Sequence, residues 1–202
     1  MRVVAFGDSI TATGSGEVRP DRHWPRVVAG RTGLEVVNAG VGGNTTTLGL
    51  DRIDRDVVAK KPGLVLVEFG FNDCHYPPGE RAPRTSLELF ERNLDCIVEH
   101  VTERTDARAA LVVNHPTTRE GEAHRAPNGR SYEENKRTYD EAARRVAGRT
   151  GSLLLDMEAA FRAAEGPLAS LLISDGLHLS EAGDAVYARA VEDFLRREGF
   201  AA

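Results

Sequence analysis

The stretch Val3-Val4-Ala5-Phe6-Gly7-Asp8-Ser9-Ile10 decides the fold, because it joins an apolar run directly to a turn of small and polar residues. Its first four residues are apolar without polar alternation, which is typical of a strand buried on both faces of a parallel sheet. Four similar runs follow along the chain. They cover residues 35–38, 64–69, 109–113 and 153–155. The sequence therefore predicts five buried strands.

Amphipathic segments lie between the apolar runs, and two of them begin with the spacing of a capping box. Thr85 and Glu88 precede one predicted helix. Ser131 and Glu134 precede another, which we expect to end at Gly148.

Two further helices complete the alternation. One follows Thr47 and is expected to end before Pro62-Gly63, and the last is capped by Ser180 and runs to Gly199. Alternating strands and helices predict a three-layer α/β/α fold around a five-stranded parallel sheet. We expect the flavodoxin-like strand order 2-1-3-4-5 and a single domain over residues 1–202.

The composition excludes several classes of protein. The 202 residues include 26 basic and 31 acidic side chains, a net charge of −5, so no nucleic-acid partner is expected. Cys74 and Cys96 are too few for a disulfide framework and lack a zinc pattern. No apolar run reaches the roughly 20 residues of a membrane helix. We expect no metal, no organic cofactor and no membrane partner, and a cytoplasmic location because a secretory signal is lacking. The sequence carries no signal for an oligomeric state.

One connection is longer than this fold requires. Residues 115–130 (HPTTREGEAHRAPNGR) are polar and contain several Gly and Pro residues. We interpret them as a flap over a site, with a disordered insertion as the alternative.

Four short motifs follow predicted strands, three of them directly and the last after a short helical detour. Ser9 follows the first strand, Gly43 lies in a glycine-rich turn after the second, Asn72 follows the third, and Asp175 and His178 come after the fifth. Each motif alone is typical of ordinary structure, such as a helix cap or an Asx turn. Because parallel strands end at one edge of a sheet, all four motifs are expected to converge on one crevice.

Together these residue types suit nucleophilic catalysis. A serine hydroxyl becomes a nucleophile when a histidine takes its proton, and an acid three residues before the histidine can orient the ring. Backbone N–H groups of a glycine turn and an asparagine amide can donate hydrogen bonds to a developing oxyanion.

The four motifs resemble the blocks of the SGNH (GDSL) hydrolase family, which contains esterases, lipases, thioesterases and carbohydrate deacetylases. The matching blocks are Gly7-Asp8-Ser9, Gly43, Gly70-Phe71-Asn72-Asp73 and Asp175-Gly176-Leu177-His178. The resemblance implies that Ser9 is the nucleophile, His178 the general base and Asp175 its orienting acid. It also implies an oxyanion hole made by the Ser9 and Gly43 amides and the Asn72 side chain.

The loops at this edge predict a small, polar substrate. Residues 11–17, 74–80 and 115–130 contain few large apolar side chains, so a groove for a long acyl chain is not expected. We therefore expect hydrolysis, through an acyl-enzyme, of short-chain, acetyl-type esters of a polar alcohol. The candidate substrate-binding residues are Asp8, Phe71, Tyr76 and His115.

Other functions stay open on the sequence. His23-Trp24-Pro25 resembles the thioesterase and lysophospholipase branch of the family. Cys74 beside His75 would suit a thiol enzyme, and Asp73 would mimic the phosphoacceptor of a flavodoxin-like signalling domain. A non-catalytic ligand-binding domain is a further alternative, and it predicts no labelling of Ser9 by a fluorophosphonate.

Overall fold

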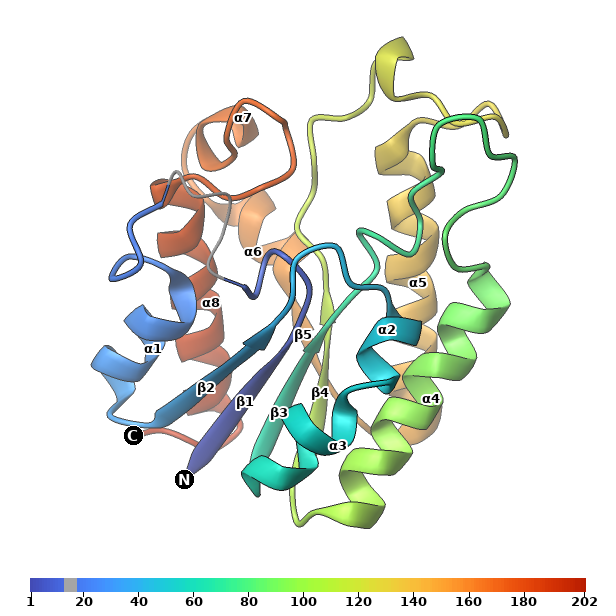
Figure 1. Ribbon diagram of the computed structural model, residues 1–202. Helices are drawn as coiled ribbons and strands as arrows, with labels where there is room; N and C mark the ends of the chain where they lie inside the picture. Colours follow the sequence, from blue (N-terminus) through green and yellow to red (C-terminus); the bar gives the residue numbers. More distant parts are fainter. Residues whose placement is uncertain (13–17) are drawn as a thin grey trace.

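The computed structural model describes residues 1–12 and 18–202, and at its centre lies a five-stranded sheet (Figure 1). The strands are β1 (Arg2–Gly7), β2 (Glu35–Gly40), β3 (Leu64–Glu68), β4 (Arg108–Val113) and β5 (Leu153–Asp156). They pair in parallel in the order β2-β1-β3-β4-β5, so the predicted order is confirmed. Their carboxyl ends share the upper edge in Figure 1.

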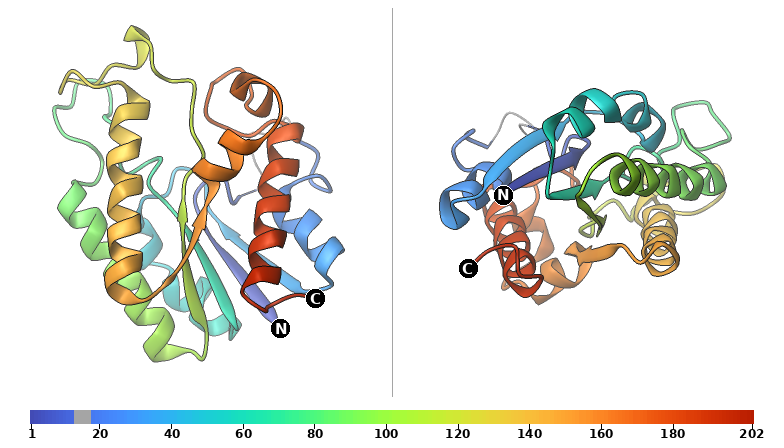
Figure 2. Two further views of the ribbon diagram at one scale, coloured as in Figure 1. Left: turned by 180° about the vertical axis from the view of Figure 1, so that it is seen from behind. Right: turned by 90° about the horizontal axis from the view of Figure 1, so that it is seen from below.

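Helices cover both faces of the sheet, which confirms the three-layer α/β/α fold (Figures 1 and 2). On one face pack α1 (Trp24–Thr32), α6 (Met157–Ala163) and α8 (Glu181–Arg197). On the other lie α2 (Thr46–Leu50), α3 (Ile53–Asp56), α4 (Leu87–Arg104) and α5 (Tyr132–Thr150). The shorter pieces are η1 (Val58–Lys60), η2 (Glu122–His124) and α7 (Leu168–Leu171). None of the helices in the described residues is long and apolar enough to cross a membrane.

Every residue of β3 is buried, which explains why this strand is a continuous apolar run in the sequence. Glu68 differs from the other residues of β3 because it carries a carboxyl group, and it is only 1% exposed. A carboxyl group in such a place requires hydrogen-bond partners or a bound proton.

The start of α4 differs from the prediction. Its cap is Ser86, whose side chain accepts a hydrogen bond from the first turn of the helix. Thr85 is buried, its N–H donates to the Asp73 carbonyl, and its own carbonyl accepts from the Tyr139 hydroxyl. The predicted capping box of Thr85 and Glu88 is therefore wrong by one residue, because tertiary contacts hold Thr85 outside the helix.

The other predicted caps are present. Ser131 and Glu134 form the complete capping box of α5, and Ser180 caps α8. The helix α5 continues past Gly148, however, and ends where Gly151 adopts a left-handed conformation with φ 69°. The helix α8 ends at Arg197, short of its predicted end.

The segment after Thr47 forms three short pieces, α2, α3 and η1, where a single helix was predicted. Arg52 interrupts the segment at φ −118° because its guanidinium turns into the core. There it donates to the Ala39 carbonyl at 2.7 Å and to the Gly7 carbonyl at 2.8 Å. Arg52 thus ties together the ends of β1 and β2, beside the predicted site.

The long loop 115–130 lies against the segment that contains Asp175. The Thr118 N–H donates to the Gly176 carbonyl at 3.0 Å, and Arg119 Nε donates to the Asp175 carbonyl at 2.8 Å. The loop therefore borders the upper edge of the sheet, and its action as a flap stays a prediction.

Candidate active site

Ser9 lies in a tight turn that follows β1. Asp8 Oδ1 accepts a hydrogen bond from the Ile10 N–H at 3.0 Å, and the Ala12 N–H donates to the Asp8 carbonyl at 2.9 Å. From behind the turn, the buried indole of Trp24 donates to the Ile10 carbonyl at 2.9 Å. These contacts present the half-buried Ser9 at the carboxyl edge of the sheet.

Ser9, His178 and Asp175 form one hydrogen-bonded chain. Ser9 Oγ lies 2.9 Å from His178 Nε2, and His178 Nδ1 lies 2.5 Å from Asp175 Oδ2. In this geometry the imidazole can accept the serine proton on one side while a carboxylate orients it on the other. Residues 169 positions apart in the sequence thus meet through the fold.

The loop around Asp175 is shaped to hold this arrangement. Asp175 Oδ1 accepts from the N–H groups of Leu177 and His178, each at 2.9 Å. Burial raises the pKa of Asp175, but hydrogen bonds from the His178 ring and from these two amides outweigh it, so the pKa lies below its ordinary value. Gly176 has φ 70°, and a Cβ there would lie 2.4 Å from Thr118 Oγ1, so a side chain at this position would strain the backbone and displace Thr118.

The glycine turn after β2 borders Ser9. A Cβ built on Gly42 would lie 4.0 Å from the Ser9 Cβ, and Gly43 has φ 76°. Within residues 1–12 and 18–202, the Ser9 and Gly43 N–H groups donate to no protein acceptor. Both N–H groups could therefore donate to a bound group, and their role as oxyanion donors stays a prediction.

Asn72 is held at both ends of its amide. Its Nδ2 donates to Asp8 Oδ2 at 3.0 Å, and its Oδ1 accepts from the Arg84 guanidinium at 3.2 Å. An amide nitrogen has two hydrogens, so the second N–H is free for a further acceptor.

Two buried carboxyl groups lie beneath the turn. Glu68 Oε2 accepts from the Asp8 N–H at 3.3 Å and from the Thr11 hydroxyl at 3.0 Å. Its Oε1 is buried and has no hydrogen-bond partner among the residues that the structure describes. Burial raises the pKa of Asp8 to about 6. Burial, and then the charge of Asp8, raise the pKa of Glu68 well above its ordinary value. Glu68 therefore holds a proton more readily than a surface carboxyl.

Three of the four candidate substrate-binding residues lie in the interior. Asp8 and His115 are 0% exposed and Phe71 is 2% exposed, so none of them reaches a substrate directly. The His115 ring packs 4.9 Å from both Phe71 and Phe161, and burial lowers its pKa to about 3. Tyr76 is half-buried and lines a cavity between the loops that follow β3 and β4.

The residues that would serve a thiol enzyme or a phosphoacceptor domain are buried. Cys74 is buried, and burial raises the pKa of its thiol, so it is a poor nucleophile. Asp73 is also buried, and its Oδ1 accepts from the Thr46 N–H at 2.9 Å and hydroxyl at 2.6 Å. It therefore fixes the start of α2. No cluster of three potential metal ligands occurs in the part of the chain that the structure describes.

Three residues near the site escaped the sequence-based predictions. Glu68 belongs to an apolar strand in the sequence, and Arg84 and Arg119 lie in polar loops. Nothing in the local sequence signals them, because their contacts to Asp8, Asn72 and Asp175 arise only from the fold.

Similar proteins share this architecture. The protein is 29% identical to an acetylxylan esterase of Geobacillus stearothermophilus, in an alignment that covers 98% of this chain and 94% of that protein. The crystal structure of Axe2, an acetylxylan esterase from the same organism, superposes with a TM-score of 0.76 at 27% identity, covering 98% of this chain and 94% of the other. An uncharacterised lipoprotein of Bacillus subtilis, YqeF, is 36% identical over 102 residues, which are 48% of this chain and 42% of that protein.

The family assignment rests on a match to a family model over most of the chain. Residues 5–186 match the GDSL-like lipase/acylhydrolase family. The match spans all four motifs, from the Ser9 turn to the segment with Asp175 and His178. The chain therefore belongs to the GDSL-like lipase/acylhydrolase family and is a carboxylic ester hydrolase.

Proposed function

We propose that the protein is a serine esterase that hydrolyses short-chain, acetyl-type esters of a polar alcohol through an acyl-enzyme. The observation that carries the proposal is the chain from Ser9 Oγ through His178 to Asp175, with distances of 2.9 Å and 2.5 Å.

In the first half-reaction, Ser9 Oγ attacks the ester carbonyl carbon while His178 Nε2 takes the hydroxyl proton. Asp175 stabilises the resulting imidazolium. The tetrahedral oxyanion accepts hydrogen bonds from the Ser9 and Gly43 N–H groups and from Asn72 Nδ2. His178 then gives its proton to the leaving alcohol oxygen as the C–O bond breaks, which leaves an ester on Ser9.

In the second half-reaction, water attacks the acyl-enzyme and His178 takes the water proton. The same donors receive the second oxyanion, and the Ser9 oxygen leaves with the proton from His178. The products are a carboxylic acid and free enzyme, and the sequence of steps requires no metal ion or organic cofactor.

A short acyl group suits the surroundings of Ser9. The small cavity bordered by Ser9, Ile10 and His178 is also lined by the buried residues His23 and Asp184. It holds about 10 Å³, roughly the space of one water molecule, and so offers no room for an acyl chain. Phe71 is buried and so cannot line an acyl groove. Residues 13–17 of the polar loop 11–17 lie outside the described residues. The name of the Geobacillus relative, an acetylxylan esterase, also supports an acetyl-type substrate.

The test is covalent labelling by a fluorophosphonate together with hydrolysis of p-nitrophenyl acetate. We expect Ser9→Ala to abolish labelling and to lower kcat by roughly 10⁶-fold, the typical loss when a nucleophile is removed. Ser170→Ala changes an exposed serine that takes no part in the hydrogen bonds joining Ser9, His178 and Asp175, and it serves as the control. Retention of one tenth of the wild-type kcat in Ser9→Ala would exclude Ser9 as the nucleophile.

A further inference from the structure

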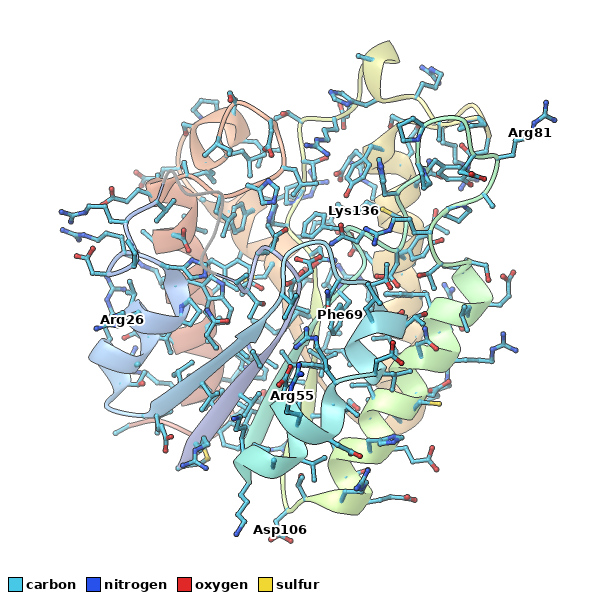
Figure 3. The ribbon with its side chains drawn as sticks, in the orientation of Figure 1. Arg26, Arg55, Phe69, Arg81, Asp106 and Lys136 are labelled. Carbon is cyan, nitrogen blue, oxygen red and sulfur yellow. The ribbon has the colours of Figure 1, made fainter. Side chains whose placement is uncertain are left out.

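The start of α1 carries two buried side chains, His23 and Trp24, that the proposed reaction does not use. They are 4% and 1% exposed, whereas Arg26, two residues further on and labelled at the left of Figure 3, is exposed. A buried imidazole has lost its hydrogen bonds to water, so its nitrogens need partners inside the protein. The partners of His23 lie on two sides, in the turn that presents the nucleophile and in α8.

The first contacts hold the turn that presents Ser9. The Trp24 indole donates to the Ile10 carbonyl at 2.9 Å, and His23 Nε2 lies 3.1 Å from the Thr11 carbonyl. Two neighbouring side chains thus bind two neighbouring carbonyls, one and two residues after the proposed nucleophile. A rotation of the turn would break both bonds, so these bonds fix the direction in which the serine hydroxyl points.

The second contacts reach Asp184, in the first turn of α8. Asp184 Oδ1 accepts from the Trp24 N–H at 2.9 Å and lies 2.9 Å from His23 Nδ1. The Asp184 side chain is buried, and its backbone N–H donates to the Ser180 carbonyl at 2.8 Å. Ser180 follows the proposed general base, His178, by two residues. His23 therefore joins the nucleophile's turn to the segment that carries the base.

The same residues lie close to the reacting groups. His23 and Asp184 line, together with Ser9 and His178, the cavity of about 10 Å³. That volume is roughly the space of one water molecule, so little room separates the buried pair from the two reacting groups. A shift of the pair would therefore change the 2.9 Å contact between Ser9 Oγ and His178 Nε2.

The partners of the His23 ring also define its protons. Within residues 1–12 and 18–202, each ring nitrogen has one partner, and both partners are oxygens, of the Asp184 carboxylate and the Thr11 carbonyl. A carbonyl oxygen only accepts, so Nε2 carries a proton. Asp184 Oδ1 also accepts from the Trp24 N–H at the start of α1, a place that favours a carboxylate, so Nδ1 carries a proton too. A ring with two protons is an imidazolium, and its charge strengthens both bonds.

We propose that His23, as an imidazolium paired with Asp184, is a positioning residue that aligns Ser9 with His178. The inference rests on the proposed esterase mechanism and adds a residue that acts without touching the substrate. One hydrogen bond of the ring holds the nucleophile's turn, and the other holds the helix that follows the base. Loss of the bond to Thr11 frees the turn and lowers the fraction of enzyme in which the serine hydroxyl reaches the base.

Two substitutions separate the two bonds of the ring. The side-chain nitrogen of glutamine takes about the place of Nε2, and that of asparagine the place of Nδ1. His23→Gln therefore keeps a donor for Thr11, whereas His23→Asn keeps one for Asp184 only. We expect His23→Asn to lower kcat for p-nitrophenyl acetate by roughly 10- to 100-fold, as loss of a hydrogen bond from a charged donor would give, and His23→Gln to lower it less. KM should change little in both variants, because the ring does not contact the ester.

A matched control removes a hydrogen bond at the other end of the same helix. The Thr32 hydroxyl donates to the Val28 carbonyl at 2.7 Å. Thr32→Val should lower the free energy of unfolding in urea and leave kcat at its wild-type value. Each kcat is divided by the fraction of protein that a fluorophosphonate labels at completion, which corrects for unfolded enzyme. If circular dichroism shows that His23→Asn is unfolded, Asp184→Asn replaces it, because that change keeps an acceptor for the Trp24 N–H and removes the charge that pairs with the ring.

The wild-type protein provides a second measurement. We expect nitrogen-15 NMR at pH 7 to show a proton on both ring nitrogens of His23, with the signals assigned by their loss in His23→Gln. A ring nitrogen without a proton would overturn the inference. A normalised kcat in His23→Asn, or in the Asp184→Asn that replaces it, equal to that of Thr32→Val would overturn it as well.

The outcomes separate this inference from the esterase proposal. Either contrary result, in a wild-type protein that hydrolyses the ester and is labelled at Ser9, removes the positioning role of His23 and leaves the esterase intact. If no ester is hydrolysed and Ser9 resists the fluorophosphonate, the esterase proposal fails, and the positioning role fails with it.

Discussion

Asn72 donates a hydrogen bond to Asp8 across 3.0 Å, which links the residue before Ser9 to the proposed oxyanion donor. Asp8 is fully buried, so its carboxylate serves the site by fixing its neighbours. One oxygen holds the Ile10 N–H and the other holds the Asn72 amide. One carboxyl group therefore positions both the Ser9 turn and the Asn72 amide of the proposed oxyanion hole.

The first prediction concerns Asn72. Asn72→Ala removes one preorganised donor, so kcat should fall by roughly 10²–10³, about 3–4 kcal/mol of transition-state stabilisation. KM should change little, because the bond to the carbonyl oxygen strengthens mainly in the transition state. Steady-state kinetics on p-nitrophenyl acetate measure both constants. A large rise in KM at unchanged kcat would instead assign Asn72 to substrate binding.

The second prediction separates His178 from Asp175. His178→Ala should be nearly as damaging as Ser9→Ala, with a loss in kcat of roughly 10⁶, because it removes the base. Asp175→Asn should cost about 10⁴, since the imidazole remains but loses the carboxylate that fixes its tautomer. The reverse order of these two losses would contradict the assigned roles, and circular dichroism of both variants controls for misfolding.

The third prediction concerns stability and pH. The raised pKa of Glu68 means that the folded protein binds its proton more tightly than the unfolded chain. Its contribution to the free energy of unfolding is therefore greatest below the ordinary pKa of about 4.5 and is lost as pH rises through the raised value. Glu68→Gln removes this loss. Above pH 4.5 the free energy of unfolding of the variant should therefore rise relative to that of the wild type, by roughly 1–3 kcal/mol at most.

Urea unfolding from pH 4 to pH 9 measures the difference between wild type and Glu68→Gln. Glu103→Gln, an exposed change on α4, is the control and should show no such trend. A constant difference at all pH values would mean that Glu68 does not gain a proton on folding.

The sequence was enough to predict the strands, their order and the grouping of Ser9, His178 and Asp175. Buried strands leave uninterrupted apolar runs, and the motifs with Ser9, Gly43 and Asn72 follow strand ends closely. Asp175 and His178 follow β5 only after α6 and α7, yet they still lie at the same edge of the sheet. The burial of individual side chains could not be predicted in the same way. Phe71 and His115 follow strand ends, where exposure was expected, yet they pack against each other at 4.9 Å.

The missed residues have a common cause. Glu68 and Arg84 take their roles from partners distant in the sequence, Thr11 and Asn72. The sequence predicts Thr85 as a helix cap because it does not show that the Thr85 N–H donates to the Asp73 carbonyl. The single domain and the cytoplasmic location stay predictions.

The last prediction concerns the acyl chain. The small cavity bordered by Ser9 and His178 holds about 10 Å³ and has no room for an acyl chain. Phe71 is buried, and Tyr76 lines a separate cavity between the loops that follow β3 and β4. If an acyl groove existed, the four methylenes that separate butyrate from octanoate would add up to about 3 kcal/mol, or roughly 10²-fold in kcat/KM. We expect no such gain. In a p-nitrophenyl series from acetate to palmitate, each ester below its micelle concentration, kcat/KM should be highest from acetate to butyrate and should fall beyond. A steady rise to eight carbons or more would reveal an apolar groove and would assign the protein to long-chain lipases or thioesterases.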